Sequence, residues 1–280
     1  MIFKTLKEKC NYYRDLTDYR LLPNGYILVM IDGKNFSKLV KNKFNKPFDS
    51  DFIEIMNRTA EHVSKQIQNC VGSYIQSDEI SFLIKDNNMT DPPFDGRLCK
   101  LQSIIPSIAT AYFMKEMVNY NSIKYMREMI ESNLSNYQHE IEQPCRIEFD
   151  VMNIPDYCFD AKVWSVPNEN DAIAWFLYRQ IDCVRNSKQQ FCQTYLSHKE
   201  LMGLDSDKQV QLCKEKTGHD WNTISEDKKY GRFLYKDIVP KTNEKGENYI
   251  RRVWEIWSGD LTNEENRRDL INKWLKEEEK

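Results

Sequence analysis

The sequence lacks the long apolar runs that would assign it to a membrane. No apolar run in its 280 residues approaches the ~20 residues that a membrane-spanning helix requires. The N-terminal stretch MIFKTLKEKCNYYRD has neither the apolar centre nor the small-residue cleavage site of a secretory signal peptide. We therefore expect a cytoplasmic protein with no membrane partner.

Clustered metal-binding side chains are also lacking. The chain has eight cysteines and only four histidines, and no two cysteines are spaced as in a C-x-x-C pair. Structural zinc sites usually contain such closely spaced ligands. We therefore expect free thiols, which are the usual state of cysteine in the cytosol.

The sequence has no charge excess that would identify a partner. Its net charge is −3, from 40 basic and 43 acidic residues. This balance does not exclude nucleic-acid binding, because basic side chains can gather on one face of a protein. The length and the hydrophobic content of 40% fit a globular core domain with an extension.

The first part of the chain has the element order of a split β-α-β fold. Residues 25–33, GYILVMIDG, form a continuous apolar run typical of a buried central strand. A helix capped by Asp49 or Ser50 and two short strands within residues 70–86 are expected to follow. The remaining elements are a second helix and two strand-like runs, predicted at residues 94–118, 145–155 and 159–167. A β-α-β-β-α-β order is the ferredoxin-like arrangement.

The turn between the two short strands reads Ser77-Asp78-Glu79, which by itself is typical of any polar turn. In a ferredoxin-like sheet, however, the first strand ends beside this turn, which brings Asp32 within reach of Asp78. Neighbouring carboxylates repel unless a cation lies between them, and Mg²⁺ prefers oxygen ligands. The Gly33 carbonyl is a candidate third ligand, since no side chain blocks it. Two metal ions held there would orient a triphosphate and activate a hydroxyl for in-line displacement.

Basic residues follow both acidic positions. The loop after the first strand contains Lys34, Lys38, Lys41, Lys43 and Lys46, and the second helix opens with Arg97 and Lys100. Such a run is commonly a solvated face. Beside a metal site it is also a candidate for binding a triphosphate.

These motifs resemble those of the tRNA-His guanylyltransferase superfamily, enzymes that add nucleotides to RNA 5′ ends in the 3′-to-5′ direction. The resemblance rests on the segments IDGKNFSKL, KPFDSDFIEIMNRTA, YIQSDEISFLI and GRLCKLQSIIPSIATAYF, which fall in family order. It extends from about Leu6 to Lys236.

The resemblance implies a polymerase-palm-like α+β core that binds two Mg²⁺ ions through Asp32, the Gly33 carbonyl and Asp78, with ATP, GTP and other nucleoside triphosphates as substrates. Glu79 belongs to the second acidic motif and is grouped with the two catalytic aspartates. By motif position, the expected nucleotide contacts are Lys34, Asn35, Phe36, Ser37 and Ser77, and the expected triphosphate contacts are Lys46, Arg97 and Lys100.

RNA contacts are expected in two places. A long helix predicted over residues 168–196 contains Arg185, Asn186 and Lys188, for which surface positions without a ligand are the alternative. The segment DKKYGRFLYK, with Lys229 and Arg232, resembles a family segment near the RNA.

Two departures from the family pattern bear on the substrate. Guanylyltransferases proper have His where this chain has Ser37, and His-Ile-Asn-Asn where it has Val184-Arg185-Asn186-Ser187. Both departures resemble the tRNA-His guanylyltransferase-like proteins, which rebuild 5′-truncated tRNAs by Watson–Crick templating. We therefore expect template-dependent repair of truncated tRNA, after a nucleoside triphosphate has activated a 5′-monophosphate end.

Three alternatives stay open. The chain could add a single G to tRNA-His, or be a palm-type nucleotide cyclase, or be an RNA-binding protein whose catalytic site has decayed. The basic C-terminal third counts against the cyclase, and the intact pair of Asp32 and Asp78 counts against the decayed enzyme.

The chain is expected to divide near residue 170. Residues 1–170 would form the catalytic core, with an N-terminal helix and a polar insertion near 119–144. Residues 171–280 would form a mainly helical, basic region packed on that core. The family resemblance also implies a homo-oligomer, most often a tetramer.

Overall fold

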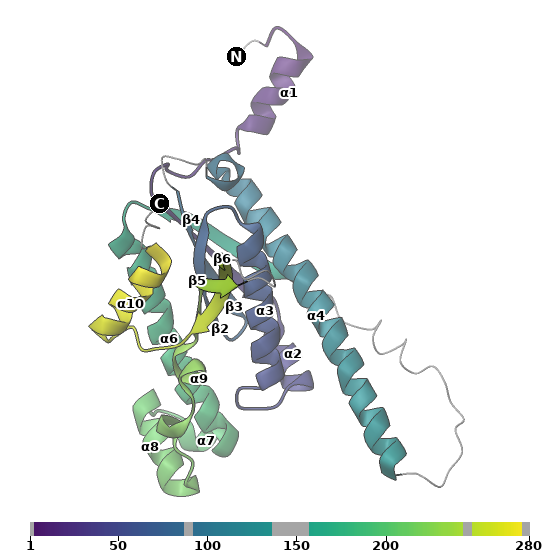
Figure 1. The fold of residues 1–280 in the computed structure, drawn as a ribbon, viewed down its shortest axis with the longest axis vertical. Coiled ribbons are helices and arrows are strands. Elements are labelled where there is room, and N and C mark those ends of the chain that lie inside the picture. Colours follow the sequence, from purple (N-terminus) through teal and green to yellow (C-terminus); the bar gives the residue numbers. More distant parts are fainter. Residues whose placement is uncertain (1–2, 87–91, 136–156, 243–247, 276–280) are drawn as a thin grey trace.

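A single antiparallel sheet organises the computed structural model, which describes residues 3–86, 92–135, 157–242 and 248–275. Its strands are β1 (Tyr26–Gly33), β2 (Cys70–Gln76), β3 (Glu79–Lys85), β4 (Phe159–Val166), β5 (Arg232–Thr242) and β6 (Asn248–Trp257) (Figure 1). They lie in the order β4-β1-β3-β2-β5-β6. The first four have the ferredoxin-like order, so the α+β fold predicted from the sequence is confirmed.

Helices cover both faces of the sheet (Figure 1). On one face lie α3 (Ser50–Gln66) and α4 (Leu98–Ser135), and on the other lie α6 (Glu169–Tyr195) and α10 (Glu264–Leu275). Successive side chains of a strand point to opposite faces. Ile27 and Val29 of β1 therefore pack with α3 and α4, while Leu28 packs with α6.

The loop that enters α3 is held by its N-cap. The Asp49 carboxylate accepts hydrogen bonds from the backbone N–H groups of Asp51 (2.9 Å) and Phe52 (3.1 Å), which satisfies two donors that a helix start leaves free. Its other oxygen accepts from the N–H of Asn45 at 2.8 Å. The predicted cap is thus confirmed, and it also ties down the segment after α2 (Phe36–Lys43).

The segment after residue 118 differs from the polar insertion expected from the sequence. Residues 119–135 of the expected polar insertion continue α4, which runs unbroken past Pro106 to Ser135. Within this stretch Tyr120, Ile123, Met126 and Ile130 keep helical spacing, so its polar composition was a misleading sign of an insertion. The rest of that insertion, and the strand expected at 145–155, lie outside the described residues.

The C-terminal part contributes to the same sheet and adds a small helical cluster. α7 (His198–Leu201), α8 (Ser206–Thr217) and α9 (Glu226–Tyr230) follow the long helix α6, and α7 and α8 pack with it around the buried Trp221. The N-terminal helix α1 (Leu6–Asp15) projects from the body (Figure 1) and buries none of its residues. Across the described ranges, we find no helix with the length and apolar character that a bilayer crossing demands.

Candidate active site

The end of β1 and the turn between β2 and β3 form one wall of a cavity. Asp32 lies opposite Glu79 in the β1–β3 pairing, and the N–H of Gly33 donates to the backbone carbonyl of Asp78 at 3.2 Å. Asp32 and Asp78 both line this cavity of about 460 Å³. The structure therefore brings together the two carboxylates that the strand order predicted to meet.

Burial and like charge act together on this pair. Partial burial, followed by the charges of Asp78 and Asp160, raises the pKa of Asp32. Asp160 lies beside it because it faces Asp32 across the β1–β4 pairing. Burial also raises the pKa of Asp78, against a hydrogen bond from Ser77 that lowers it. Both carboxylates are thus in surroundings that disfavour their charge unless a cation is bound.

The donors at this tip fit a magnesium site only if backbone and amide oxygens take part. In the ranges that the structure describes, no three His, Cys, Asp or Glu side chains form a metal-binding cluster. Asp32 and Asp78 would therefore need the Gly33 carbonyl or a ligand oxygen to complete a coordination shell. Among the described residues, the buried Oε1 of Gln76, another cavity residue, has no hydrogen-bond partner.

Within the described ranges Glu79, unlike the two aspartates, forms an ion pair with a basic side chain. Its carboxylate accepts from Arg179 Nε at 2.8 Å and from Arg179 Nη2 at 2.6 Å, and also from Gln76 Nε2 at 3.1 Å. This bidentate pair is largely buried. Both oxygens of Glu79 are therefore engaged, and the residue holds Arg179 against the cavity wall.

The other predicted nucleotide contacts divide into two groups. Phe36, Ser37, Lys46 and Ser77 line the cavity, whereas Lys34 and Asn35 precede α2 without lining it. Asn35 adopts a positive φ of 64° at the N-cap of α2. Gly33 is required for packing, because a Cβ there would lie 2.4 Å from the Phe36 ring.

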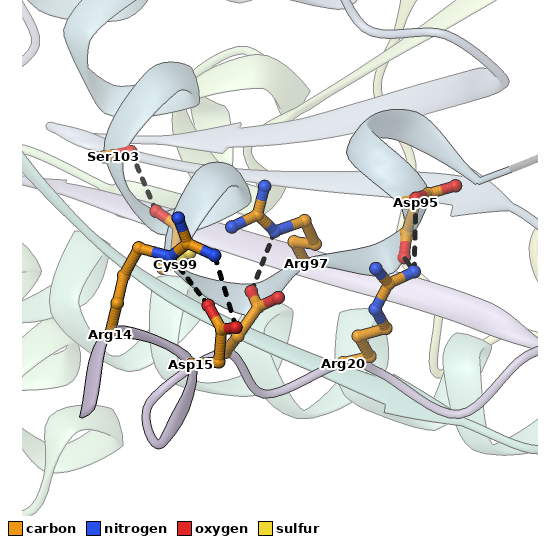
Figure 2. Close-up of polar contacts among 8 residues, drawn as sticks. Arg14, Asp15, Arg20, Asp95, Arg97, Cys99 and Ser103 are labelled. Atoms are coloured by element: carbon orange, nitrogen blue, oxygen red, sulfur yellow. Dashed lines mark hydrogen bonds and ion pairs between the residues drawn. The ribbon is translucent and has the colours of Figure 1, made fainter. Parts of the chain in front are cut away.

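Arg97 and Lys100 lie at the opposite end of β1. The N–H of Leu21 donates to the carbonyl of Gly96 at 2.9 Å, which places Arg97 near the start of the strand, while Asp32 is at its end. From Tyr26 to Asp32 the strand spans roughly 20 Å, at about 3.3 Å per residue. Arg97 donates to Asp18 at 2.8 Å, close to the Arg14–Asp15 and Arg20–Asp95 pairs (Figure 2). A triphosphate contact for Arg97 would therefore need a phosphate bound away from the carboxylate pair.

Of the expected RNA contacts, Asn186 and Arg232 line the cavity. Arg185 is exposed and pairs with Asp182. Lys188 pairs with Asp207 at 2.5 Å, and Lys229 donates to the carbonyl of Asn222 at 2.6 Å. Lys188 and Lys229 both lie over the Trp221 ring, on the helical cluster outside the cavity.

Several cavity residues had no predicted role. They come from one face of α6 and from the α9–β5 segment: Arg179, Cys183, Ser187, Gln190, Asp227, Lys228 and Gly231. The α6 residues recur at intervals of three to four, which is the spacing of one helix face. This spacing shows that the α6 residues share a face, but the sequence alone does not show that the face borders the cavity.

Comparisons with known proteins agree with this geometry. The family model described as "tRNAHis guanylyltransferase" matches residues 7–167. A relative from Debaryomyces hansenii, named tRNA(His) guanylyltransferase, is 29% identical over 78% of this chain and 76% of its own length. Solved structures of a bacterial tRNA(His) guanylyltransferase-like protein in complex with ATP and with GTP have TM-scores of 0.73 and 0.66, at 21% and 22% identity. They cover 96% and 95% of this chain, and this chain covers 99% and 98% of them. At these identities the structures establish the likeness of the fold.

Proposed function

This chain belongs to the tRNA(His) guanylyltransferase family, a family of nucleotidyltransferases, and from that premise we propose that it rebuilds the 5′ end of truncated tRNA. Each added nucleotide is selected by pairing with the opposing strand. The observation that carries the proposal is the cavity in which Asp32 and Asp78 face the cationic side chains of Lys46, Arg179 and Arg232. Its size falls within the range of small-molecule sites.

The chemistry follows from the direction of growth. A 5′-monophosphate end is first activated by ATP or GTP, with release of pyrophosphate. The 3′-hydroxyl of the incoming nucleotide then attacks the activated 5′ phosphorus. The hydroxyl loses its proton, a P–O bond forms, and the bond to the leaving nucleotide breaks.

The side chains of the cavity have separable parts in this reaction. Lys46 and Arg179 are placed to bind phosphate oxygens by charge-assisted hydrogen bonds. Asp32 and Asp78, with the Gly33 carbonyl, are the residues that would hold Mg²⁺, which would supply charge neutralisation and hydroxyl activation. We propose that this chain requires Mg²⁺ and that it uses ATP and GTP, the nucleotides bound in the structures of the bacterial tRNA(His) guanylyltransferase-like protein.

Templating is favoured over dedicated guanine addition because of what lines the cavity. Ser37, Asn186 and Ser187 are small, neutral side chains on its wall. Two of them, Ser37 and Ser187, stand where the guanylyltransferases proper have His and Asn, and the His that opens the second motif is Val184 in this chain. Without such groups committed to one base, base pairing with the opposing strand decides which nucleotide is added, and the protein reads the shape of the RNA helix.

Four 5′-truncated tRNAs that differ only in the base opposite the first missing position test the proposal. Each would be incubated with ATP, all four nucleoside triphosphates and Mg²⁺, and the 5′ ends of the products sequenced. We expect the complementary nucleotide in each case, and no addition beyond a complete acceptor stem. Addition of G to all four templates would instead support the single-G activity. Formation of a cyclic nucleotide without RNA would support the cyclase.

A further inference from the structure

Arg232 is a buried arginine for which the described residues supply no counter-charge. It is the first residue of β5 and lies opposite Ile75 of β2, next to the turn that contains Asp78. The residue is 5% exposed. Nε donates to Asn57 Oδ1 at 2.7 Å, and Nη1 donates to the carbonyl of Asp227 at 3.5 Å.

No carboxylate of the described residues forms an ion pair with this guanidinium. The charge of Asp227 acts on it only from beyond ion-pair distance, and burial lowers the pKa of Arg232. An arginine keeps its charge in proteins all the same, and it has five N–H donors. The two neutral oxygens leave most of those donors without a partner among the described residues. Arg232 is also one of the residues that line the cavity.

Such an arrangement is costly unless an anion completes it. A buried charge without a partner destabilises a fold, and replacing it by an apolar group of similar size is often neutral or stabilising. A planar guanidinium with adjacent free donors matches the geometry of phosphate oxygens. The cavity beside it is the one that contains Asp32 and Asp78.

We infer that Arg232 is a phosphate-binding residue of the catalytic cavity, where its free N–H donors bind a substrate phosphate group. This inference rests on the proposed function and refines it, because it makes Arg232 a deep substrate contact and not part of an outer RNA-binding surface. The phosphate belongs either to the nucleoside triphosphate or to the 5′ end of the RNA. Both present the same oxygens to the guanidinium.

Binding without turnover tests this assignment. Wild type, Arg232→Met and Arg232→Lys would be titrated with tripolyphosphate, ATP and adenosine, and with RNA hairpins that carry a 5′ phosphate or a 5′ hydroxyl. Arg268→Met is the control, because Arg268 is an exposed arginine of α10 that pairs with Glu264 at 2.6 Å. Thermal melting of each variant without ligand would be recorded in parallel.

For a triphosphate contact, we expect Arg232→Met to weaken tripolyphosphate and ATP binding at least tenfold and to leave adenosine binding unchanged. For a contact with the RNA end, the tenfold loss should fall on the 5′-phosphorylated hairpin and not on the 5′-hydroxyl hairpin. In either case Arg232→Lys should recover part of the loss because it restores the charge. The melting temperature of Arg232→Met should equal or exceed that of wild type.

Two results would overturn the inference. One is unchanged affinity of Arg232→Met for both tripolyphosphate and the 5′-phosphorylated hairpin. The other is a lower melting temperature with equal losses for ligands that have and lack phosphate, which is what a purely structural arginine would give. A wild-type protein that binds phosphate through Arg232 but adds no nucleotide to truncated tRNA would support this assignment and contradict the proposed function.

Discussion

Burial disfavours the charged forms of Asp32 and Asp78 as long as no cation is bound, and each also has a like charge nearby, Asp78 for Asp32 and Glu79 for Asp78. Burial raises the pKa of each, and the charge of Asp78 contributes to the shift of Asp32. A carboxyl whose folded-state pKa is above its unfolded value favours folding most at low pH. That contribution is lost as pH rises from the ordinary aspartate range through the raised pKa.

Asp78→Asn should therefore abolish nucleotide addition and still leave the metal-free protein at least as stable as wild type. The variant loses a candidate metal ligand, but it also loses a charge that the fold disfavours. Its gain in melting temperature, measured in EDTA, should grow with pH through that window and then level off. Asp32→Asn should behave in the same way. Turnover near the wild-type rate with Mg²⁺ would contradict the assignment of either residue to the metal site.

Replacing Glu79 by its amide should destabilise the fold, in contrast to the same replacement at Asp32 or Asp78. Among the described residues, Glu79→Gln leaves the largely buried Arg179 with Asp182, at 3.3 Å, as its one remaining charged partner. Breaking a buried pair costs about 3–5 kcal/mol, and the contact with Asp182 places the expected loss in the free energy of unfolding near the lower end, about 3 kcal/mol.

Urea unfolding of Glu79→Gln measures this loss. Glu54→Gln is the matched control, because Glu54 forms an exposed pair with Arg58 on α3 at 2.8 Å, and such pairs contribute less than about 1 kcal/mol. A Glu79→Gln variant with wild-type stability and no activity would make Glu79 a direct participant in the reaction, not the residue that positions Arg179.

Among the elements, the start of α3 couples helix stability to the cavity. Asp49 caps α3 and also accepts from the N–H of Asn45, the residue before the cavity residue Lys46. Asp49→Ala should lower the free energy of unfolding by about 1–2 kcal/mol, as for other lost caps. It should also raise the KM for nucleoside triphosphates, because the loop that contains Lys46 loses an anchor.

Asp205→Ala separates these two effects. Asp205 caps α8 by accepting from the N–H of Lys208 at 2.9 Å, and α8 does not line the cavity. This control should lose comparable stability with an unchanged KM. Equal KM values for the Asp49 and Asp205 variants would show that the cap acts on the helix alone.

On the scale of the whole molecule, α1 has exposed apolar side chains that the predicted homo-oligomer could use as a contact. It projects from the body (Figure 1), and its Leu6 and Tyr13, with Leu16 directly after it, are exposed. The predicted homo-oligomer would bury such side chains, which a monomer leaves in water.

Replacing Leu6, Tyr13 and Leu16 together by Ser should therefore lower the mass measured by light scattering, with little change in the stability of the separated chain. Lys7→Ser with Lys9→Ser on the same helix is the control, for which the mass should not change. A wild-type protein that is monomeric at micromolar concentration would contradict the oligomer. An unchanged mass of the triple variant would place the contact elsewhere.

The sequence by itself determined the elements and the meeting of the two aspartates. Strand and helix periods are local properties, and the Asp49 cap needs only its own neighbours. Asp78 lies at a turn and Asp32 at the end of a continuous apolar strand. Once a ferredoxin-like strand order is assumed, these two positions in the sequence predict that the side chains lie close together in space. The motif residues Phe36, Ser37 and Ser77 line the cavity because they lie within a few residues of those two ends, whereas Lys46 reaches it from the segment between α2 and α3.

Only the tertiary structure decided which basic side chains line the same cavity as the two aspartates. Arg97 belongs to a family motif, yet antiparallel pairing places it at the opposite end of β1. Arg179 and Arg232 reach the cavity because α6 crosses the sheet and β5 pairs with β2. These contacts are set by how distant segments pack, so no local pattern encodes them. The same packing buries Arg232, and no carboxylate in the described ranges forms an ion pair with it.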